Sequence, residues 1–255
     1  MEIEKLIQEK ISEIESTEHV KILHAVESGS RAWGFASTNS DYDVRFIYVR
    51  TKQDYLKLNP VSDVINWQLD EVFDINGWDL KKALCLLKNS NPTVFEWNLS
   101  PIVYQTTDFW QNHQEIINQY FSCKAGVYHY LNTAKTSYQK FLTSNQIKLK
   151  KYFYVLRPIL ACRWILKYKK PAPMLFTELT NSMLEPEMQN LIQNLLNRKI
   201  NSSESSTSNP IPELNTYLLR NLNLLEKQAN SLSDDKNQDW NMLNQMFLDG
   251  LDSFC

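Results

Sequence analysis

Glycine is scarce in this sequence, with five among 255 residues. Tight hairpins and close approaches of two backbones depend on glycine, because it lacks a Cβ and tolerates positive φ angles. The scarcity therefore favours long helices over a hairpin-rich sheet. Three of the five glycines, Gly29, Gly34 and Gly77, lie in or near the stretch that carries the candidate chemistry.

Cysteine, net charge and long apolar runs are also low. The four cysteines are scattered without metal-ligand spacing, which predicts reduced thiols. A net charge of −2 gives no global basic signal for nucleic acid, so any such surface must be local. No apolar run approaches the roughly 18 residues that span a bilayer, and the charged N-terminus lacks the apolar core of a signal peptide. We therefore expect a cytoplasmic protein with no membrane partner.

The apolar pattern changes character along the chain. Residues 2–17 have helical spacing, and strands are expected over 20–27, 44–49, 64–67 and 71–77, with a loop around Pro60. A helix capped by Asp79 is expected over 80–87, and Asn91-Pro92 begins a short one. Helical spacing then dominates over 108–121, 124–143, 147–168, 175–198 and 212–250. We predict an α+β protein, with a mixed-sheet domain over residues 1–105 and an α-helical domain over 106–255 that contains a flexible loop at about 199–210.

The stretch from Gly29 to Asp43 joins a Gly-Ser pair to two aspartates one residue apart. Asp41 and Asp43, at positions i and i+2 of a strand, would point to the same face. Two adjacent carboxylates repel each other, and a hard cation such as Mg²⁺ offsets the repulsion because it prefers oxygen ligands. An isolated Asp-x-Asp is more often a turn with a solvent-facing carboxylate. The upstream Gly-Ser and a further carboxylate in a later strand favour a metal-dependent phosphate site here.

Two aspartates compete for the place of that third carboxylate, which two-metal phosphoryl transfer requires. Asp79 is adequately explained as a helix cap. Asp74 lies between Phe73 and Ile75 in an expected strand, where a charge is costly unless it is paired or bound to metal. We predict that Asp41, Asp43 and Asp74 are the catalytic, metal-binding residues, with Asp79 as the alternative to Asp74.

Candidate nucleotide contacts lie in two places. Glycine at position 29 lets the backbone approach a phosphate, while the Ser30 hydroxyl and the Arg31 guanidinium supply donors. Trp33 and Phe35 are expected to pack under the turn rather than to stack on a base.

The second place is the helix expected over 147–168. Lys150, Tyr154 and Arg157, at i, i+4 and i+7, share one face that would suit a triphosphate or an RNA backbone. Lys151 competes with Lys150 for this role, and an ordinary amphipathic helix with solvated lysines is the alternative.

Taken together, these residues resemble the DNA polymerase beta-like nucleotidyltransferase superfamily. Its signature is Gly-Ser, a spacer, Asp-x-Asp on a strand and a third carboxylate on a neighbouring strand. The text of residues 27–49 resembles, more narrowly, the RlaP/YcgL-type predicted nucleotidyltransferases, which are associated with RNA repair. Residues 74–84, 91–104 and 150–158 add to the likeness by their order, and the resemblance covers about residues 20–180.

The resemblance implies a polymerase-beta-like catalytic domain that moves a nucleoside monophosphate from an NTP to a hydroxyl acceptor, with Mg²⁺ or Mn²⁺ as cofactor. It implies that Asp41 and Asp43 bind the metal that carries the triphosphate, and that Asp74 completes a second metal site and helps to activate the acceptor. RNA or tRNA is the acceptor that it suggests. Nucleotide transfer to a protein side chain and a non-catalytic nucleotide-binding module remain as alternatives.

Overall fold

The computed structural model describes residues 2–59, 61–202 and 206–253. The chain divides into two compact units. The first contains Met1–Gly29, Asp41–Phe121 and Lys236–Cys255, and the second contains Ser30–Ser40 and Ser122–Asp235. The chain thus passes between the units within the Gly29–Asp43 stretch, and again near Phe121 and Asp235. The domain boundary near residue 105 stays a prediction, since the compact units divide the chain elsewhere.

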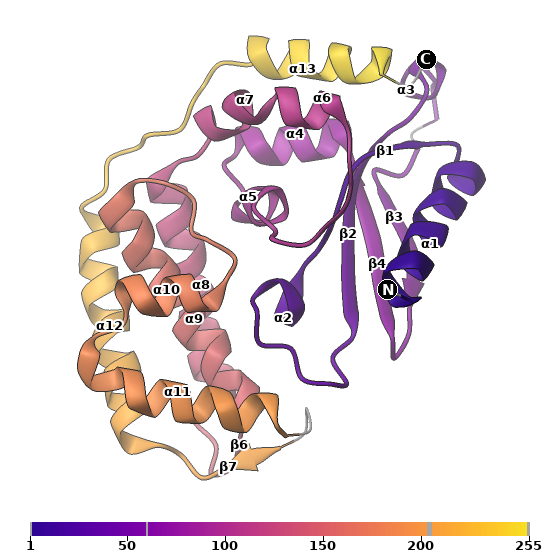
Figure 1. The fold of residues 1–255 in the computed structure, drawn as a ribbon. Helices are drawn as coiled ribbons and strands as arrows, with labels where there is room; N and C mark the ends of the chain where they lie inside the picture. Colours follow the sequence, from indigo (N-terminus) through magenta and orange to yellow (C-terminus); the bar gives the residue numbers. More distant parts are fainter. Residues whose placement is uncertain (1, 60, 203–205, 254–255) are drawn as a thin grey trace. The chain divides into compact units, whose positions relative to one another are not determined.

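The first unit is built on a five-stranded sheet with the order β3-β4-β2-β1-β5 (Figure 1). Only β2 and β4 run parallel; the other neighbours are antiparallel. The strands are β1 (Lys21–Glu27), β2 (Tyr42–Val49), β3 (Val64–Leu69), β4 (Phe73–Asp79) and β5 (Val103–Thr106). The first four confirm predicted strands. The sequence did not suggest β5, which is four residues long and has no fully buried position.

One face of the sheet is covered by α1 (Glu2–Glu18), which confirms the helix predicted over 2–17. Ile7, Ile11 and Ile14 of the helix share a buried cluster with side chains from β1 to β4. Phe46 of β2 lies opposite Gly77 of β4, and a Cβ at Gly77 would come within 2.2 Å of the Phe46 ring. Glycine at this position therefore makes room for the ring that fills the cluster.

The other face is covered by helices that come after β4 in the chain. They share a second buried cluster with Ile47 and Val49 of β2. The helices are α4 (Leu80–Lys88), α5 (Pro92–Asn98), α6 (Asp108–Asn112), α7 (Gln114–Gln119) and α13 (Asn241–Asp252). The short α3 (Lys52–Tyr55) follows β2.

Two helix starts in the first unit lie where the sequence predicted them. Asp79 caps α4 and accepts a hydrogen bond from the Lys81 N–H at 2.8 Å, and Asn91 caps α5, as predicted. The segment of helical spacing over 108–121 forms two short helices. His113 ends α6, its Nδ1 lies 2.7 Å from the Phe109 carbonyl oxygen, and the chain starts again as α7. Within the described parts of the chain, no helix has the length and apolarity to cross a membrane.

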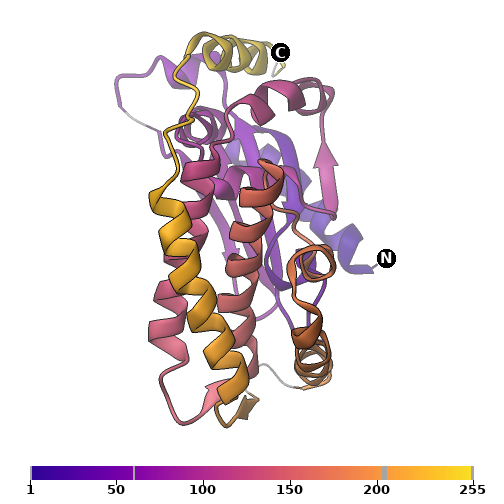
Figure 2. The same ribbon diagram turned by 90° about the vertical axis from the view of Figure 1, so that its left-hand side faces the viewer.

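The second unit is mainly helical, and its three longest helices run side by side (Figure 2). These are α8 (Cys123–Phe141), α9 (Leu149–Tyr168) and α12 (Pro212–Asn230). The shorter α10 (Phe176–Met183) and α11 (Pro186–Ile200) correspond to the helices predicted over 175–198. The region predicted as helical over 212–250 is divided between α12 and α13 by residues without helical structure.

The loop predicted at about 199–210 is shorter than expected. Helix α11 continues to Ile200, and β7 (Thr207–Ser208) pairs with β6 (Ile147–Lys148). Residues 203–205 of that prediction, and Pro60 of the other predicted loop, lie outside the described residues.

One carboxylate joins the start and the end of the long second-unit segment. Asp235 accepts hydrogen bonds from the Ser122 hydroxyl, from the Cys123 N–H at 2.7 Å and from the Lys124 N–H at 3.3 Å. Burial alone would raise the pKa of Asp235, but these hydrogen bonds lower it. Asp235, at the end of the segment, therefore provides the hydrogen-bond acceptors for the N–H groups in the first turn of α8.

Candidate active site

The candidate site of the first unit centres on an aspartate from each of the two parallel strands. Asp43 of β2 and Asp74 of β4 lie at the same register. Nη2 of Arg45 lies 2.9 Å from Asp43 Oδ1 and 2.6 Å from Asp74 Oδ2. Nη1 of the same side chain donates to the Asp74 carbonyl oxygen at 2.6 Å. A single guanidinium thus provides the positive charge between the two carboxylates.

The strand alternation explains why these groups are not buried in the core. Side chains at odd positions of β2 share one face. Ile47 and Val49 on that face lie in the cluster under α4, whereas Asp43 and Arg45 lie beyond it. The side chains of Arg45, Asp43 and Asp74 keep 14%, 21% and 28% of their surface exposed. The start of the β2–β4 pair is therefore polar, partly exposed and backed by a rigid sheet.

A buried glutamate holds the backbone at Asp43. Glu27, at the end of β1, is fully buried, and its Oε1 accepts a hydrogen bond from the Asp43 N–H at 2.9 Å. Its Oε2 accepts from the Tyr104 hydroxyl. The Ser28 N–H in turn donates to the Asp43 carbonyl oxygen at 2.8 Å. Asp43 is therefore fixed by its neighbours on β1 as well as by Arg45.

Gly29 faces the Asp43 carboxylate directly. Its φ is +58°, and a Cβ built on it would lie 1.9 Å from Asp43 Oδ2. An alanine would be strained by the backbone angle and would displace the carboxylate. The predicted role of Gly29 in close approach is consistent with this geometry, although the group that it approaches in the structure is a carboxylate.

The three predicted carboxylates are not equally placed. Asp41 is exposed and precedes the first residue of β2, so it is not on the strand with Asp43 as expected. Among the described residues, no three acidic, histidine or cysteine side chains are grouped closely enough to hold a metal. The site nevertheless fits a hard cation in its chemistry. Asp43 and Asp74 offer oxygen donors, and the Arg45 guanidinium stands between them as a cation.

Asp79 lies at the opposite end of the same strands. Its register partner is Tyr48, near the end of β2, whereas Asp74 is the partner of Asp43. It is buried, which raises its pKa, and it accepts a hydrogen bond from the Tyr55 hydroxyl at 2.8 Å. Its position therefore agrees with the choice of Asp74 as the aspartate beside Asp43.

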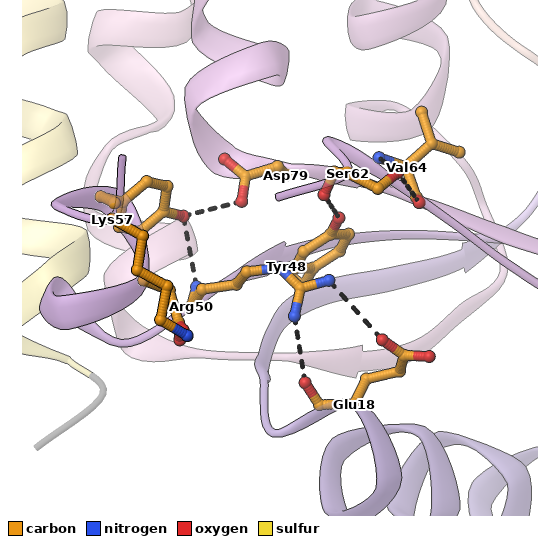
Figure 3. A network of polar contacts seen from close by, with 9 residues as sticks. Glu18, Tyr48, Arg50, Lys57, Ser62, Val64 and Asp79 are labelled. Atoms are coloured by element: carbon orange, nitrogen blue, oxygen red, sulfur yellow. Dashed lines mark hydrogen bonds and ion pairs between the residues drawn. The ribbon is translucent and has the colours of Figure 1, made fainter. Parts of the chain in front are cut away.

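A cavity of about 550 Å³ opens at this opposite end of the strands. Figure 3 shows the polar network beside it, in which Arg50 contacts Glu18 and Tyr48 contacts Ser62. Asp79 and Arg50 line the cavity, together with the pairs Lys57–Asp54 and Lys82–Asp63. Cations and anions are nearly balanced here, and no residue of the predicted site other than the alternative Asp79 takes part.

The predicted nucleotide contacts, apart from Gly29, belong to the second unit. Ser30 and Arg31 lie in α2 (Gly29–Ala32), a short helix where a turn was expected. The Ser30 and Arg31 carbonyl oxygens accept hydrogen bonds from the Phe35 and Gly34 N–H groups, and the Arg31 guanidinium donates to the Ser40 carbonyl oxygen. Arg31 thus joins the start of the 30–40 segment to its end.

Arg157 was expected to contact a nucleotide, but in the structure its side chain is buried among other side chains of the second unit. It is 3% exposed, its guanidinium carbon lies 4.6 Å from the centre of the Trp33 ring, and Nη2 lies 3.4 Å from Met174 Sδ. The Tyr154 ring meets the Trp33 ring edge-on, with 6.1 Å between the two ring centres. Phe35 is buried, so the expectation that Trp33 and Phe35 pack is confirmed.

The two competing lysines of α9 are both partly buried. Lys151 Nζ lies 4.4 Å from the centre of the Tyr154 ring and 3.9 Å from that of Phe141. Lys151 is therefore engaged with aromatic rings. Lys150 is half-buried on the same helix, and its anion contact stays a prediction.

Glu27 and Arg45 are the site residues that sequence reasoning did not assign. Each had a signal, because each is a charged residue in an otherwise apolar strand segment. A charge in such a place requires a partner. Their partners lie on other strands, so the pairing could not be identified before the register of the sheet was known.

The mixed sheet, with an aspartate on each of two parallel strands beside a Gly-Ser segment, is that of a polymerase-beta-like nucleotidyltransferase. The chain belongs to the RlaP family, described as an RNA repair pathway DNA polymerase beta family, whose model matches residues 3–249. It is 40% identical over 244 residues to the uncharacterized protein YcgL of Bacillus subtilis, covering 95% of this chain and 94% of that protein.

A solved structure with a looser likeness is the nucleotidyltransferase-like protein from Exiguobacterium sibiricum. The identity is 13% and the TM-score 0.33, over 90% of this chain and 75% of that one. Family membership alone indicates a transferase of the nucleotidyl-transferring class.

Proposed function

We propose that this protein is a Mg²⁺-dependent nucleotidyltransferase that moves a nucleoside monophosphate from an NTP to a hydroxyl group of RNA or tRNA. The observation that carries the proposal is the pairing of Asp43 with Asp74 at one register of two parallel strands, at the polar and partly exposed end of the sheet. The membership of the chain in an RNA repair pathway family supports RNA as the acceptor.

Each residue has a proposed task. Asp41, Asp43 and Asp74 would hold Mg²⁺ or Mn²⁺, which when bound supplies positive charge for the triphosphate. Glu27 fixes the backbone of Asp43 by accepting a hydrogen bond from its N–H group. Ser30, Arg31, Lys150 and Tyr154 are proposed to contact the nucleotide, and Arg157 to position Trp33.

The proposed reaction forms one bond and breaks one. The acceptor hydroxyl oxygen attacks the α-phosphorus, Asp74 accepts the hydroxyl proton, and the bond from the α-phosphorus to the bridging oxygen breaks. Pyrophosphate leaves with the electron pair of that bond. The contribution of the protein is orientation and charge neutralisation, because phosphoryl transfer requires little covalent participation by side chains.

Transfer of label from nucleotide to acceptor tests the proposal. The full chain is incubated with Mg²⁺ and each α-labelled NTP, with tRNA, with RNA carrying a 3′ hydroxyl, or with neither. We expect label on RNA from at least one NTP and none with Asp43→Ala. Label on the protein itself would move the acceptor to a protein side chain. Equal behaviour of wild type and Asp43→Ala would overturn the catalytic proposal.

A further inference from the structure

The cation already present between Asp43 and Asp74 belongs to the protein. One nitrogen, Nη2 of Arg45, lies within hydrogen-bonding distance of both carboxylates, at 2.9 and 2.6 Å. The second nitrogen, Nη1, donates to the carbonyl oxygens of Asp74, at 2.6 Å, and of Val44, at 3.1 Å. The guanidinium is thus held by both strands, and its single positive charge offsets part of the negative charge of the acidic pair.

A divalent cation and this guanidinium would need the same oxygens. The carboxylate oxygens that face Arg45 are the donors that the proposed function assigns to Mg²⁺. Arg45 is only 14% exposed, so its contacts with the carboxylates are poorly screened and stronger than those of a surface pair. Asn76 donates to Asp74 Oδ1 at 3.3 Å and leaves Oδ2 to Arg45.

We propose that Arg45 is a resident counter-ion that competes with the divalent cation for Asp43 and Asp74, and so sets the affinity of the site for metal. The inference rests on the proposed function and adds a positioning residue to it. Binding of the cation releases the guanidinium from at least one carboxylate. In the absence of the cation, Arg45 prevents the two carboxylates from repelling each other and keeps them in register.

The test measures metal binding and not activity. Mn²⁺ is titrated into the full chain without nucleotide, and free Mn²⁺ is followed by its electron paramagnetic resonance signal. Arg45→Gln removes the competing charge. We expect this variant to bind Mn²⁺ at least about tenfold more tightly than the wild type does. Arg45→Lys keeps the charge but not the planar fork, and its affinity should lie between the two.

Two variants serve as controls in the same titration. Lys82→Gln also removes one cation, but Lys82 pairs with Asp63 at 2.9 Å, far along the strands from Asp43. Its affinity should stay within about twofold of wild type, because exposed charges at long range are screened. Asp43→Asn should lose most of the binding.

The outcomes separate this inference from the proposed function. If wild type binds Mn²⁺ through Asp43 and Arg45→Gln binds it equally, the role of Arg45 fails while the metal site stands. If wild type and Arg45→Gln both fail to bind at millimolar Mn²⁺, the metal-dependent function fails with it.

A second measurement follows the wild type itself. The arginine Nε–Hε signals of the wild type are recorded by NMR during a Mg²⁺ titration, with Arg45→Lys used only for assignment. We expect the Arg45 signal to shift with the binding isotherm. The Arg163 signal should not move, because Arg163 pairs with Glu185 at 2.6 Å within the second unit. An Arg45 signal unmoved at metal saturation would overturn the inference.

Discussion

The two units place an arginine in opposite surroundings. Arg45 lies between two carboxylates at the polar end of a sheet face, with 14% of its side chain exposed. Arg157 is 3% exposed and lies against the Trp33 ring and the Met174 sulfur. Both come from segments rich in apolar residues, but only Arg157 was predicted to contact an anion. Their neighbours assign the first to electrostatics and the second to packing.

The Gly29–Asp43 stretch is divided between the same two units. Its ends, Gly29 and the aspartates, belong to the sheet unit, where exposure and charge suit chemistry. Its middle, residues 30–40, belongs to the helical unit, where aromatic side chains and Arg157 hold it. Paired substitutions, one in each region or at each end of the strands, therefore separate the two roles.

The strongest contrast is between the two aspartates of β4. Asp74→Asn should lower nucleotide transfer about 10³-fold, because asparagine cannot accept the hydroxyl proton and is a weaker ligand for the cation. Asp79→Asn should leave transfer intact and change the free energy of unfolding by no more than about 1 kcal/mol, since asparagine also caps helices. Label transfer and urea unfolding measure the two effects. Equal losses of activity in both variants would contradict the assignment of Asp74.

The positive-φ glycines give a second contrast. Gly29 (φ +58°) faces Asp43, whereas Gly34 (φ +80°) faces Leu175 at 3.2 Å in the other unit. Alanine at either position should cost roughly 1–2 kcal/mol of stability because of the left-handed backbone. Only Gly29→Ala should also reduce transfer, about 10²-fold, since it displaces a carboxylate. Activity lost equally in Gly34→Ala would show that strain alone explains the effect.

The arginines themselves can be compared by their effect on unfolding. Arg157→Leu removes a buried cation from the Trp33 ring, and we expect a loss of about 2–4 kcal/mol in unfolding free energy. Arg45→Gln is partly exposed and keeps a donor, so its loss should be about 1 kcal/mol. Urea titration followed by tryptophan fluorescence measures both. The opposite ranking would mean that Arg157 is not held by packing.

Acid should affect the sheet unit through its buried histidine. Burial lowers the pKa of His24 to about 4, against 6.5 in the unfolded chain. Between these values the unfolded chain binds the extra proton, so stability is lost as the pH falls through this window. The loss should reach up to about 3 kcal/mol near pH 4.

Substitution of that histidine tests the origin of the acid sensitivity. His24→Gln should remove most of the slope of unfolding free energy between pH 6.5 and 4.5. Identical slopes in wild type and His24→Gln would assign the effect to carboxylates.

Periodicity and caps predicted most of the fold. Val44, Phe46 and Tyr48 alternate with Asp43 and Arg45, and this alternation specified β2 and its two faces. The capping signals of Asp79 and Asn91 placed the starts of α4 and α5. The four-residue β5 was missed because a strand so short shows no alternation.

The site was predictable in its residue types but not in its pairings. The proximity of Asp43 and Asp74 was expected from strand placement, and the register bears it out. The contacts of Arg45 and Glu27 depend on which strands are neighbours, which the sequence does not state. The burial of Arg157 depends on Trp33 reaching α9 from more than a hundred residues away along the chain. Helical spacing can place Arg157 on a face of α9 but cannot reveal what covers that face.

The Asp235 carboxylate has a consequence for how the chain can be altered. Since it contacts Ser122 and the first N–H groups of α8, the two ends of the long helical insert meet at one point. A connection of a few residues could span these two ends, so a change of length within 122–235 away from the ends would leave the spacing of Phe121 and Lys236 unchanged. Residues 30–40 belong to the same unit, so such a change must keep the side chains of the insert that pack against Trp33 and Phe35.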